Sequence, residues 1–204
     1  MKSTMKDILI TMLRDKTISR SMFRWTAERL THILAGQAAA YVQTKNVAIQ
    51  TPIAAAQGIV FSKKIVLVPI LRSGITMLSP FLQYFPDAVV GVVGLKRDEK
   101  TKKANWYYEN LPSIGADDQV VILDPMLATG GTAIETITLL KKNGVAEEHI
   151  LFVGIVSAPE GIKAVKTKFS QVKLLIAAED EKLNSNAYIV PGLGDYGDRY
   201  FGTE

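Results

Sequence analysis

The sequence predicts an α/β fold in which a mainly parallel sheet is flanked by helices. The first observation is a series of short, continuous apolar runs, which are typical of strands buried on both faces of a parallel sheet. The second is that these runs alternate with segments whose apolar residues recur at helical spacing. The third is size, because 204 residues, 48% of them hydrophobic, are enough for one sizeable core. We therefore expect residues 1–204 to form a single domain.

The first expected elements are a long helix and a hairpin. Thr17-Ile-Ser19 can begin a helix that runs from Arg20 to about Val42. Five apolar residues repeat on one face of this helix and should be buried: Phe23, Ala27, Leu30, Leu34 and Ala38. Two short strand patterns at 47–50 and 57–61, on either side of Pro52, predict a β-hairpin.

From residue 65 onward, strands and helices are expected to alternate. The expected strands are 65–68, 88–95, 120–123, 149–157 and 174–178, and the expected helices are about 75–84, 133–142 and 159–169. Asn143-Gly144 is typical of a helix end, and Pro159 suits a first helical turn. This alternation is typical of a parallel sheet that is covered on both faces.

Two segments do not fit the alternation. Residues 96–111 are charged and then aromatic, and they are long for a connection in a compact domain. We expect them to form either an arm that closes over a ligand or a loop without fixed structure. Residues 183–204 are rich in Gly, Asp, Tyr and Pro, and we expect no helix or long strand there.

Composition and charge exclude several classes of protein. Cysteine is absent, which rules out disulfides, thiolate metal sites and cysteine nucleophiles and fits a reducing compartment. The apolar run 8–13 is short and is followed by charges, so it is no signal peptide, and no apolar stretch is long enough for a bilayer. We expect a cytoplasmic protein without membrane contact. The net charge of +4 is mild and no basic stripe carries aromatics, so small polyanions are expected rather than nucleic acid.

The most informative motif is residues 120–132, Val-Val-Ile-Leu-Asp-Pro-Met-Leu-Ala-Thr-Gly-Gly-Thr. A strand, a glycine turn and a helix start form an anion-binding device, because glycines let backbone N–H groups approach a phosphate and the helix dipole adds positive charge. Asp124 lies too early to hold that phosphate and is better placed for sugar hydroxyls, so the motif predicts a ribose 5-phosphate site. The alternative is that the glycines only fit a tight turn. A Walker-type loop is excluded, since no Gly-Lys-Ser/Thr follows.

Four segments together resemble the uracil phosphoribosyltransferase family. Residues 68–74, Val-Pro-Ile-Leu-Arg-Ser-Gly, resemble its pyrophosphate-binding loop, and 96–99 with 107–112 resemble its flexible arm. Asp124 to Thr132 is similar to its phosphoribosyl diphosphate signature. Residues 188–199, Tyr-Ile-Val-Pro-Gly-Leu-Gly-Asp-Tyr-Gly-Asp-Arg, resemble its uracil-binding segment. The resemblance covers roughly residues 17–204 in the family's order.

The resemblance implies a type I phosphoribosyltransferase-like fold with a flexible β-arm at about 96–111 and a small C-terminal hood at about 183–204. It implies a pentosyltransferase that moves ribose 5-phosphate from phosphoribosyl diphosphate to uracil, giving UMP and pyrophosphate in pyrimidine salvage. Mg2+ is the implied cofactor, a homodimer or larger homo-oligomer the implied assembly, and GTP an implied effector in some members. The transition state should resemble an oxocarbenium ion, so positioning and electrostatics supply most of the rate.

The resemblance also implies residue roles. Asp124, Arg97 and Asp195 are the expected catalytic residues. Asp124 should accept hydrogen bonds from the ribose hydroxyls, and Arg97 should fold over the pyrophosphate. The expected phosphoribosyl diphosphate contacts are Arg72, Ser73, Gly74, Arg97, Asp124, Pro125, Met126, Leu127, Ala128, Thr129, Gly130, Gly131, Thr132 and Asp195. A surface ion pair is the alternative for Arg72, and a helix N-cap the alternative for Thr132. Lys96 stands where the family commonly has Tyr, and the lysines at 100, 102 and 103 receive no role.

The uracil contacts are expected from Ile189, Gly194, Asp195 and Tyr196, with main-chain groups pairing to the alternating carbonyl and N–H groups of the base. Tyr196 stands where relatives often have Ala, so a ring pointing into the pocket would put uracil preference in doubt. Asp195 is expected to reach the donor indirectly, through Mg2+ or its waters. The pattern Gly192-x-Gly-x-x-Gly197 matches the dinucleotide fingerprint by letter only, because no helix and no βαβ unit are expected around it.

Two other functions stay open at this point. The first keeps the phosphoribosyl donor but uses a different base, which a comparison of uracil, cytosine and purines as substrates would reveal. The second is a non-catalytic regulator that retains the pocket to sense nucleotides or bind RNA. The complete set of Arg72, Asp124 and Asp195 and the lack of a basic RNA face argue against the regulator.

Overall fold

A computed structural model describes residues 4–97 and 104–203. Its main element is an eight-stranded sheet whose path runs β10–β9–β7–β3–β5–β6, with β4 beside β3 and β8 beside β9. All pairings in it are parallel except β5 with β6. The strands are β3 (Ile65–Leu71), β4 (Val89–Val90), β5 (Val92–Arg97), β6 (Ala104–Asn110), β7 (Gln119–Leu123), β8 (Met126–Leu127), β9 (Ile150–Ser157) and β10 (Lys173–Glu179). The predicted α/β class with a mainly parallel sheet is therefore confirmed.

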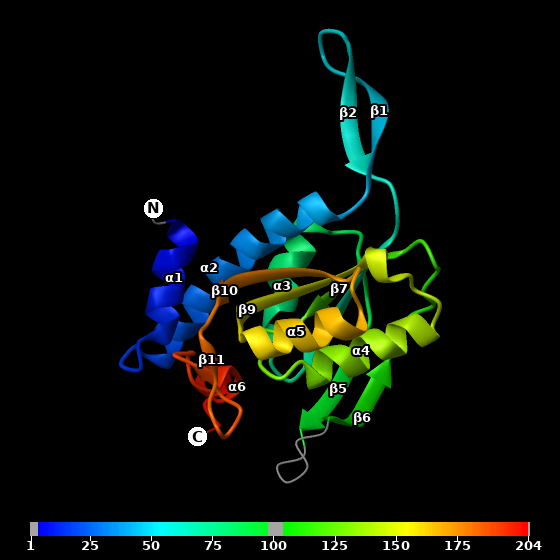
Figure 1. The fold of residues 1–204 in the computed structure, drawn as a ribbon. Coiled ribbons are helices and arrows are strands. Elements are labelled where there is room, and N and C mark those ends of the chain that lie inside the picture. Colours follow the sequence, from blue (N-terminus) through cyan, green and yellow to red (C-terminus); the bar gives the residue numbers. More distant parts are fainter. Residues whose placement is uncertain (1–3, 98–103, 204) are drawn as a thin grey trace.

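Helices cover both faces of this sheet (Figure 1). Helices α1 (Met5–Arg14), α2 (Arg20–Ala38) and α3 (Ile75–Tyr84) pack on one face, and α4 (Gly131–Lys142) and α5 (Pro159–Lys168) pack on the other. Neighbouring strand residues face opposite layers, with Val121 in the α2 layer and Val120 in the α4 layer. The five residues expected on the buried face of the long helix are all buried. A 3-10 turn, η1 (Ala39–Tyr41), ends that helix, and η2 (Glu147–His149) leads into β9.

Strands β1 (Thr44–Gln50) and β2 (Ala55–Phe61) form the predicted hairpin as a separate two-stranded sheet. The hairpin projects away from the body of the protein, and nearly all of its residues are exposed on both faces (Figure 1). Four of the strands predicted in the main sheet are confirmed to within a few residues: 65–68, 120–123, 149–157 and 174–178.

Three expectations need correction. The single strand expected at 88–95 is two strands, β4 and β5, because the ladder with β3 is interrupted at Gly91. Helix α1 was not anticipated; it begins with a capping box between Thr4 and Asp7. The C-terminal segment, expected to lack a helix, contains α6 (Tyr196–Phe201), whose N-cap is the Asp195 side chain. It also contains the short antiparallel pair β11 (Lys182–Leu183) and β12 (Ile189–Val190).

The segment 96–111 begins and ends in a regular hairpin. β5 and β6 pair antiparallel from Val92 opposite Asn110 to Arg97 opposite Ala104. Residues 98–103, which carry three of the lysines and arginines of the charged run, lie outside the described residues. Among the helices of the described ranges, none combines the length and apolar character needed to cross a bilayer.

Candidate functional site

The predicted ribose phosphate motif lies at the carboxyl edge of the parallel sheet. β7 ends at Leu123, Asp124 follows directly, and the chain reaches the start of α4 at Gly131. Gly130 takes φ +81°, a left-handed conformation that favours glycine, and its neighbour Gly131 would leave a Cβ no closer than 3.7 Å to another residue. No side chain caps α4, so the first amides of the helix point toward the turn without a helical acceptor. An amide-rich turn beside a carboxylate suits a phosphorylated sugar.

Asp124 is the titratable group with the most altered acidity in this region. Burial raises the pKa of its carboxyl from the ordinary 3.8 to about 7, opposed by hydrogen bonds from the Met126 amide (3.3 Å) and the Thr132 hydroxyl (3.5 Å). The residue as a whole remains partly accessible. A carboxyl group that is poised between its two charge states at the edge of a sheet is a functional-site candidate. Thr132 is the second residue of α4 rather than its N-cap, so its alternative interpretation as a cap is wrong.

The remaining residues of the motif are held in place by strand pairing. Met126 and Leu127 form β8 against the end of β9, and Pro125 and Leu127 are buried. Ala128 and Thr129 are half-buried, and the Ala128 carbonyl lies 2.4 Å from where a Cβ on Gly161 would be. Any contact of Pro125 and Leu127 with a ligand must therefore come from their backbones. The turn is therefore held in place by its contacts with β9 and α5.

The loop Arg72, Ser73 and Gly74 packs directly beside Asp124. A Cβ on Gly74 would lie 2.1 Å from the carbonyl oxygen of Leu123, the residue that precedes the carboxylate. No side chain fits there, so glycine is required by the close approach of the loop to the end of β7. The Leu71–Arg72 peptide bond is cis. Gly74 thus brings the predicted pyrophosphate loop next to the predicted ribose site.

The C-terminal hood, residues 183–203 in the structure, docks on the same loop. A Cβ on Gly197 would lie 2.8 Å from the Ser73 hydroxyl, so the start of α6 abuts the loop. Arg72 forms a 3.4 Å ion pair with Asp198 and lies 5.3 Å from the centre of the Phe201 ring. The surface ion pair considered for Arg72 therefore exists, but its partner is the hood. Hood, loop and Asp124 meet at one edge of the sheet.

The four residues expected to contact uracil lie in this hood. Ile189 is buried in β12, and Gly194 takes φ +79° just before the exposed Asp195. The Tyr196 ring is only 1% exposed and packs 5.4 Å from the ring of Phe23, with its hydroxyl 2.9 Å from that of Thr76. Burial raises the pKa of the Tyr196 phenol, so it stays neutral. Because the ring is sealed in the core, only the backbone of Tyr196 is available to a base.

The dinucleotide fingerprint in the hood remains fortuitous, although the reason changes. A helix does begin inside Gly192-x-Gly-x-x-Gly197, contrary to expectation. It is six residues long and follows a two-residue strand in an antiparallel pair, so no βαβ unit surrounds it.

Two site predictions reach beyond what these contacts describe. Arg97 is the last residue of β5, and its side chain lies outside the described part of the structure, so its placement over a pyrophosphate stays a prediction. The described residues hold no cluster of three or more His, Cys, Asp or Glu that could cage a metal ion. Asp195, exposed with one oxygen accepting the Asp198 amide at 3.0 Å, fits a Mg2+ ion that is bound mainly through substrate phosphates.

Several residues that hold this region together were not anticipated. Arg14 at the end of α1 pairs with Asp180 after β10, and Arg199 in α6 donates to the Leu193 carbonyl at 2.7 Å. Thr76 holds Tyr196. Isolated charged residues carry no spacing signal, and only the capping pattern that begins α1 could have drawn attention to the N-terminal helix.

The comparison with family models agrees with the geometry. The model described as uracil phosphoribosyltransferase matches residues 1–203. The chain belongs to the uracil phosphoribosyltransferase family. The match includes α1, which lies outside the stretch that carried the sequence resemblance.

Curated uracil phosphoribosyltransferases are similar over nearly the full chain. The Limosilactobacillus fermentum enzyme is 42% identical over 96% of this chain and 93% of its own length. The enzyme of Dictyoglomus turgidum is 45% identical over 96% of this chain and 94% of its own length. Membership of the uracil phosphoribosyltransferase family thus rests on nearly the whole length of this chain and of each relative.

Solved structures show the same architecture. A protein of Aquifex aeolicus superposes with a TM-score of 0.90 at 34% identity, covering 100% of this chain and 97% of its own. A purine phosphoribosyltransferase of Pyrococcus horikoshii superposes with a TM-score of 0.53 at 20% identity, covering 78% of this chain and 85% of its own. The latter similarity concerns the fold alone. This chain therefore has the same type of fold as that purine phosphoribosyltransferase.

Proposed function

We propose that this protein is a pentosyltransferase that moves ribose 5-phosphate from phosphoribosyl diphosphate to uracil, forming UMP and pyrophosphate. The observation that carries the proposal is the meeting of three segments at one sheet edge. Asp124 and its amide-rich turn lie beside the 72–74 loop, and the hood docks on that loop through Gly197 and Arg72. The named activity of relatives more than 40% identical over nearly the full chain supports the choice of uracil.

The donor is proposed to bind between the α4 turn and Asp124. Residues 129–132 hold the 5-phosphate with backbone amides and hydroxyls, while Asp124 accepts hydrogen bonds from the ribose 2- and 3-hydroxyls. Donation from these hydroxyls favours the ionised form of Asp124, whose pKa of about 7 leaves it responsive to such partners. The carboxylate then stabilises the positive charge that develops on the sugar as the bond to pyrophosphate breaks.

The leaving group is proposed to lie along the loop of Arg72, Ser73 and Gly74. Arg72 is exposed and is held at 3.4 Å from Asp198, so pyrophosphate can compete for its guanidinium with a single carboxylate. Arg97 on the 96–111 arm is proposed to close over the same group and exclude water. Asp195 would hold a Mg2+ ion through water or substrate, and that ion would supply positive charge to neutralise pyrophosphate.

Base selection is proposed to rest on main-chain groups of the hood. Ile189, Gly194 and Tyr196 present backbone donors and acceptors to uracil, and cytosine, with an unprotonated N3 and a C4 amino group, would reverse two of these partners. The buried ring of Tyr196 supports this proposal, because the side chain that differs from many relatives does not enter the base site.

Self-association is proposed to involve the β1–β2 hairpin. Ile53 at its tip is 95% exposed and Ile59 is 71% exposed, which is costly for large apolar side chains that cluster on one element. An isolated two-stranded hairpin is also only marginally stable in water. A second copy of the chain is the occupant that the family resemblance favours, so we propose a homodimer or larger homo-oligomer.

The remaining context is proposed from the sequence. The absence of cysteine supports a cytoplasmic location. GTP is proposed as an effector on the resemblance alone, and activity with and without added GTP tests it.

The decisive experiment is a base panel. Purified protein with phosphoribosyl diphosphate and Mg2+ is offered uracil, cytosine, hypoxanthine and adenine, and both nucleotide and pyrophosphate are quantified. We expect UMP and pyrophosphate in equal amounts from uracil alone. Turnover of another base would reassign the substrate, and tight nucleotide binding without turnover of any base would refute the enzyme.

A further inference from the structure

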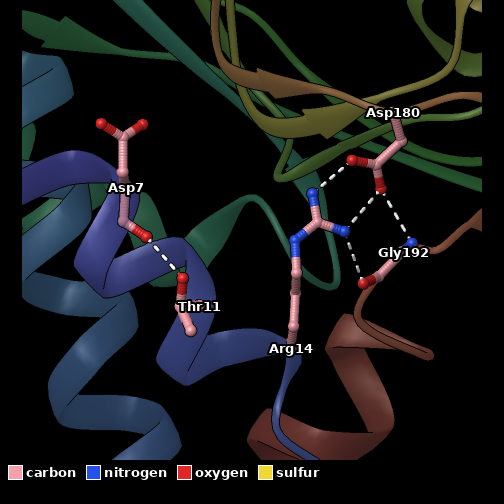
Figure 2. A network of polar contacts seen from close by, with 5 residues as sticks. All are labelled: Asp7, Thr11, Arg14, Asp180 and Gly192. Carbon is pink, nitrogen blue, oxygen red and sulfur yellow. Dashed lines mark hydrogen bonds and ion pairs between the residues drawn. The ribbon is translucent and has the colours of Figure 1, made fainter. Parts of the chain in front are cut away.

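The N-terminal helix α1 reaches the proposed base-binding hood through one side chain. Arg14, the last residue of α1, donates to the Asp180 carboxylate with both terminal nitrogens, one bond measuring 2.9 Å (Figure 2). The same guanidinium donates to the carbonyl of Gly192 at 2.9 Å, and the Gly192 amide donates to Asp180 at 2.8 Å. Both backbone groups of one hood residue are thus held by a single ion pair.

The ion pair is largely removed from solvent. The Asp180 side chain is 2% exposed and that of Arg14 is 25% exposed. Asp180 follows β10 directly, and its own amide donates to the Ser157 carbonyl at the end of β9 at 2.8 Å. The carboxylate is therefore mounted on the edge of the central sheet, the same edge at which β7 presents Asp124. The network joins three parts of the protein: the sheet, helix α1 and the hood.

The position of Gly192 links this network to the residues proposed to bind the base. Gly192 stands between Ile189 and Gly194, two of the residues proposed to contact the base through their backbones. It takes φ +63°, and a Cβ there would lie 2.2 Å from the Ile189 carbonyl oxygen, so the loop turns tightly at this point. A displacement of Gly192 would move both proposed contacts.

A second arginine fixes the next residue in the same way. Arg199 of α6 donates to the Leu193 carbonyl at 2.7 Å and to the Leu13 and Asp15 carbonyls of the α1 end at 2.5 and 2.6 Å. Consecutive hood carbonyls, those of residues 192 and 193, therefore each accept from an arginine that also ties the hood to α1 or to the sheet. In contrast, no described contact of Arg14 or Asp180 involves the loop 72–74 or the turn 129–132.

We propose that Arg14 and Asp180 form a positioning pair that sets the backbone of the hood for nucleobase binding. This inference rests on the proposed function. The pair touches neither donor nor base, and it acts by holding both backbone groups of Gly192. Its loss should weaken binding of the base more than binding of the donor, because no described contact of the pair involves the loop 72–74 or the turn 129–132, so the two Michaelis constants should separate.

The test compares Arg14→Met, Arg14→Lys and Asp180→Asn with a matched control, Arg29→Met. Arg29 is an exposed arginine of α2 whose described contact is with the Trp25 ring. The KM for uracil and the KM for phosphoribosyl diphosphate are measured for each protein, with the fraction of folded protein determined by circular dichroism. Hydrogen exchange of the 186–198 peptide is followed in parallel.

We expect Arg14→Met to raise the KM for uracil about tenfold, equivalent to roughly 1.4 kcal/mol, with less than about a twofold change in the KM for the donor. Arg14→Lys keeps the positive charge but lacks the guanidinium that donates with two nitrogens, so its KM for uracil should rise less than that of Arg14→Met. Combining Arg14→Met with Asp180→Asn should add little to either change, because both act through one network. The 186–198 amides should exchange faster in Arg14→Met and remain unchanged in Arg29→Met.

A purely structural role would lower the folded fraction and leave both Michaelis constants of the remaining enzyme unchanged, which would overturn the proposal. Equal rises in both constants would also overturn it. If Arg14→Met does not fold, Arg14→Lys and Asp180→Asn carry the same comparison. A wild-type protein that does not turn over uracil would instead refute the proposed function, and the exchange measurement would still test whether Arg14 orders the hood.

Discussion

Replacing Asp124 with Asn should make the protein more stable at pH 8 and far less active. Burial raises the pKa of this carboxyl from 3.8 to about 7. Between these two pH values the folded state binds a proton that the unfolded chain has released, so ionisation opposes folding and stability falls as the pH rises. Asn keeps one oxygen that can accept from the Met126 amide, its NH2 group can donate to the Thr132 hydroxyl, and it has no charge to lose.

The expected gain in the free energy of unfolding follows from the size of the pKa shift of Asp124. Each pKa unit corresponds to about 1.4 kcal/mol, so a shift of this size sets an upper limit of roughly 4 kcal/mol above pH 7. Asp124 is partly accessible at the edge of the sheet, and solvent there reduces the penalty. We expect a gain of about 2 kcal/mol at pH 8 and almost none at pH 4.

Urea unfolding of wild type and Asp124→Asn at pH 4, 6 and 8 measures this difference, and UMP formation at pH 8 measures the catalytic effect. Turnover should fall at least about 100-fold, the usual cost of losing one preorganised charge at a transition state. Asp117→Asn is the matched control, since a hydrogen bond from Lys63 lowers the pKa of that carboxyl and its loss should give no gain at pH 8. Equal stability of wild type and Asp124→Asn at pH 8, or undiminished turnover, would refute the assignment.

Three further outcomes follow from the packing. Gly74→Ala should lower the melting temperature sharply, because its Cβ would lie 2.1 Å from a backbone oxygen. Gly131→Ala should fold normally and raise only the KM for phosphoribosyl diphosphate. Equal melting temperatures of the two variants would contradict this prediction. Tyr196→Phe should lower the free energy of unfolding in urea by about 1 kcal/mol through loss of the Thr76 hydrogen bond, and the same bases should be used as substrates. A change of substrate to cytosine would show that the Tyr196 side chain contacts the base. Ile59→Asp on the exposed hairpin should lower the molecular mass measured by light scattering to half or less, without loss of the helical circular dichroism signal. An unchanged mass would show that self-association does not involve the hairpin.

The candidate site was largely predictable because its chemistry is local in sequence. The turn from Asp124 to Thr132 needs a strand end, two glycines and a helix start within a few residues, so its pattern can be read without a partner segment. The same holds for Gly74, although its reason was not evident from the sequence. Only the structure shows that a neighbouring strand end excludes any side chain there.

The hood was predicted as a segment but not as a structure. Its six-residue helix is too short to show a periodic pattern and forms because Tyr196 is anchored in the core by Phe23 and Thr76. A tyrosine at that position is compatible with a base pocket only because tertiary packing turns its ring away. Helix α1 is not evident from the sequence for a similar reason, since its ten residues are marginal as a helix without the layer on which they pack.

The sequence by itself determined the alternation of buried strands with helices, the glycine turn between β7 and α4, and the family, because these depend on neighbours along the chain. The tertiary structure alone decided which distant groups meet: Gly74 against the end of β7, Arg72 against the hood, and Arg14 against Asp180 across 166 positions. Contacts at such separations leave no periodic trace, because they depend on how the sheet edge gathers segments rather than on residue spacing.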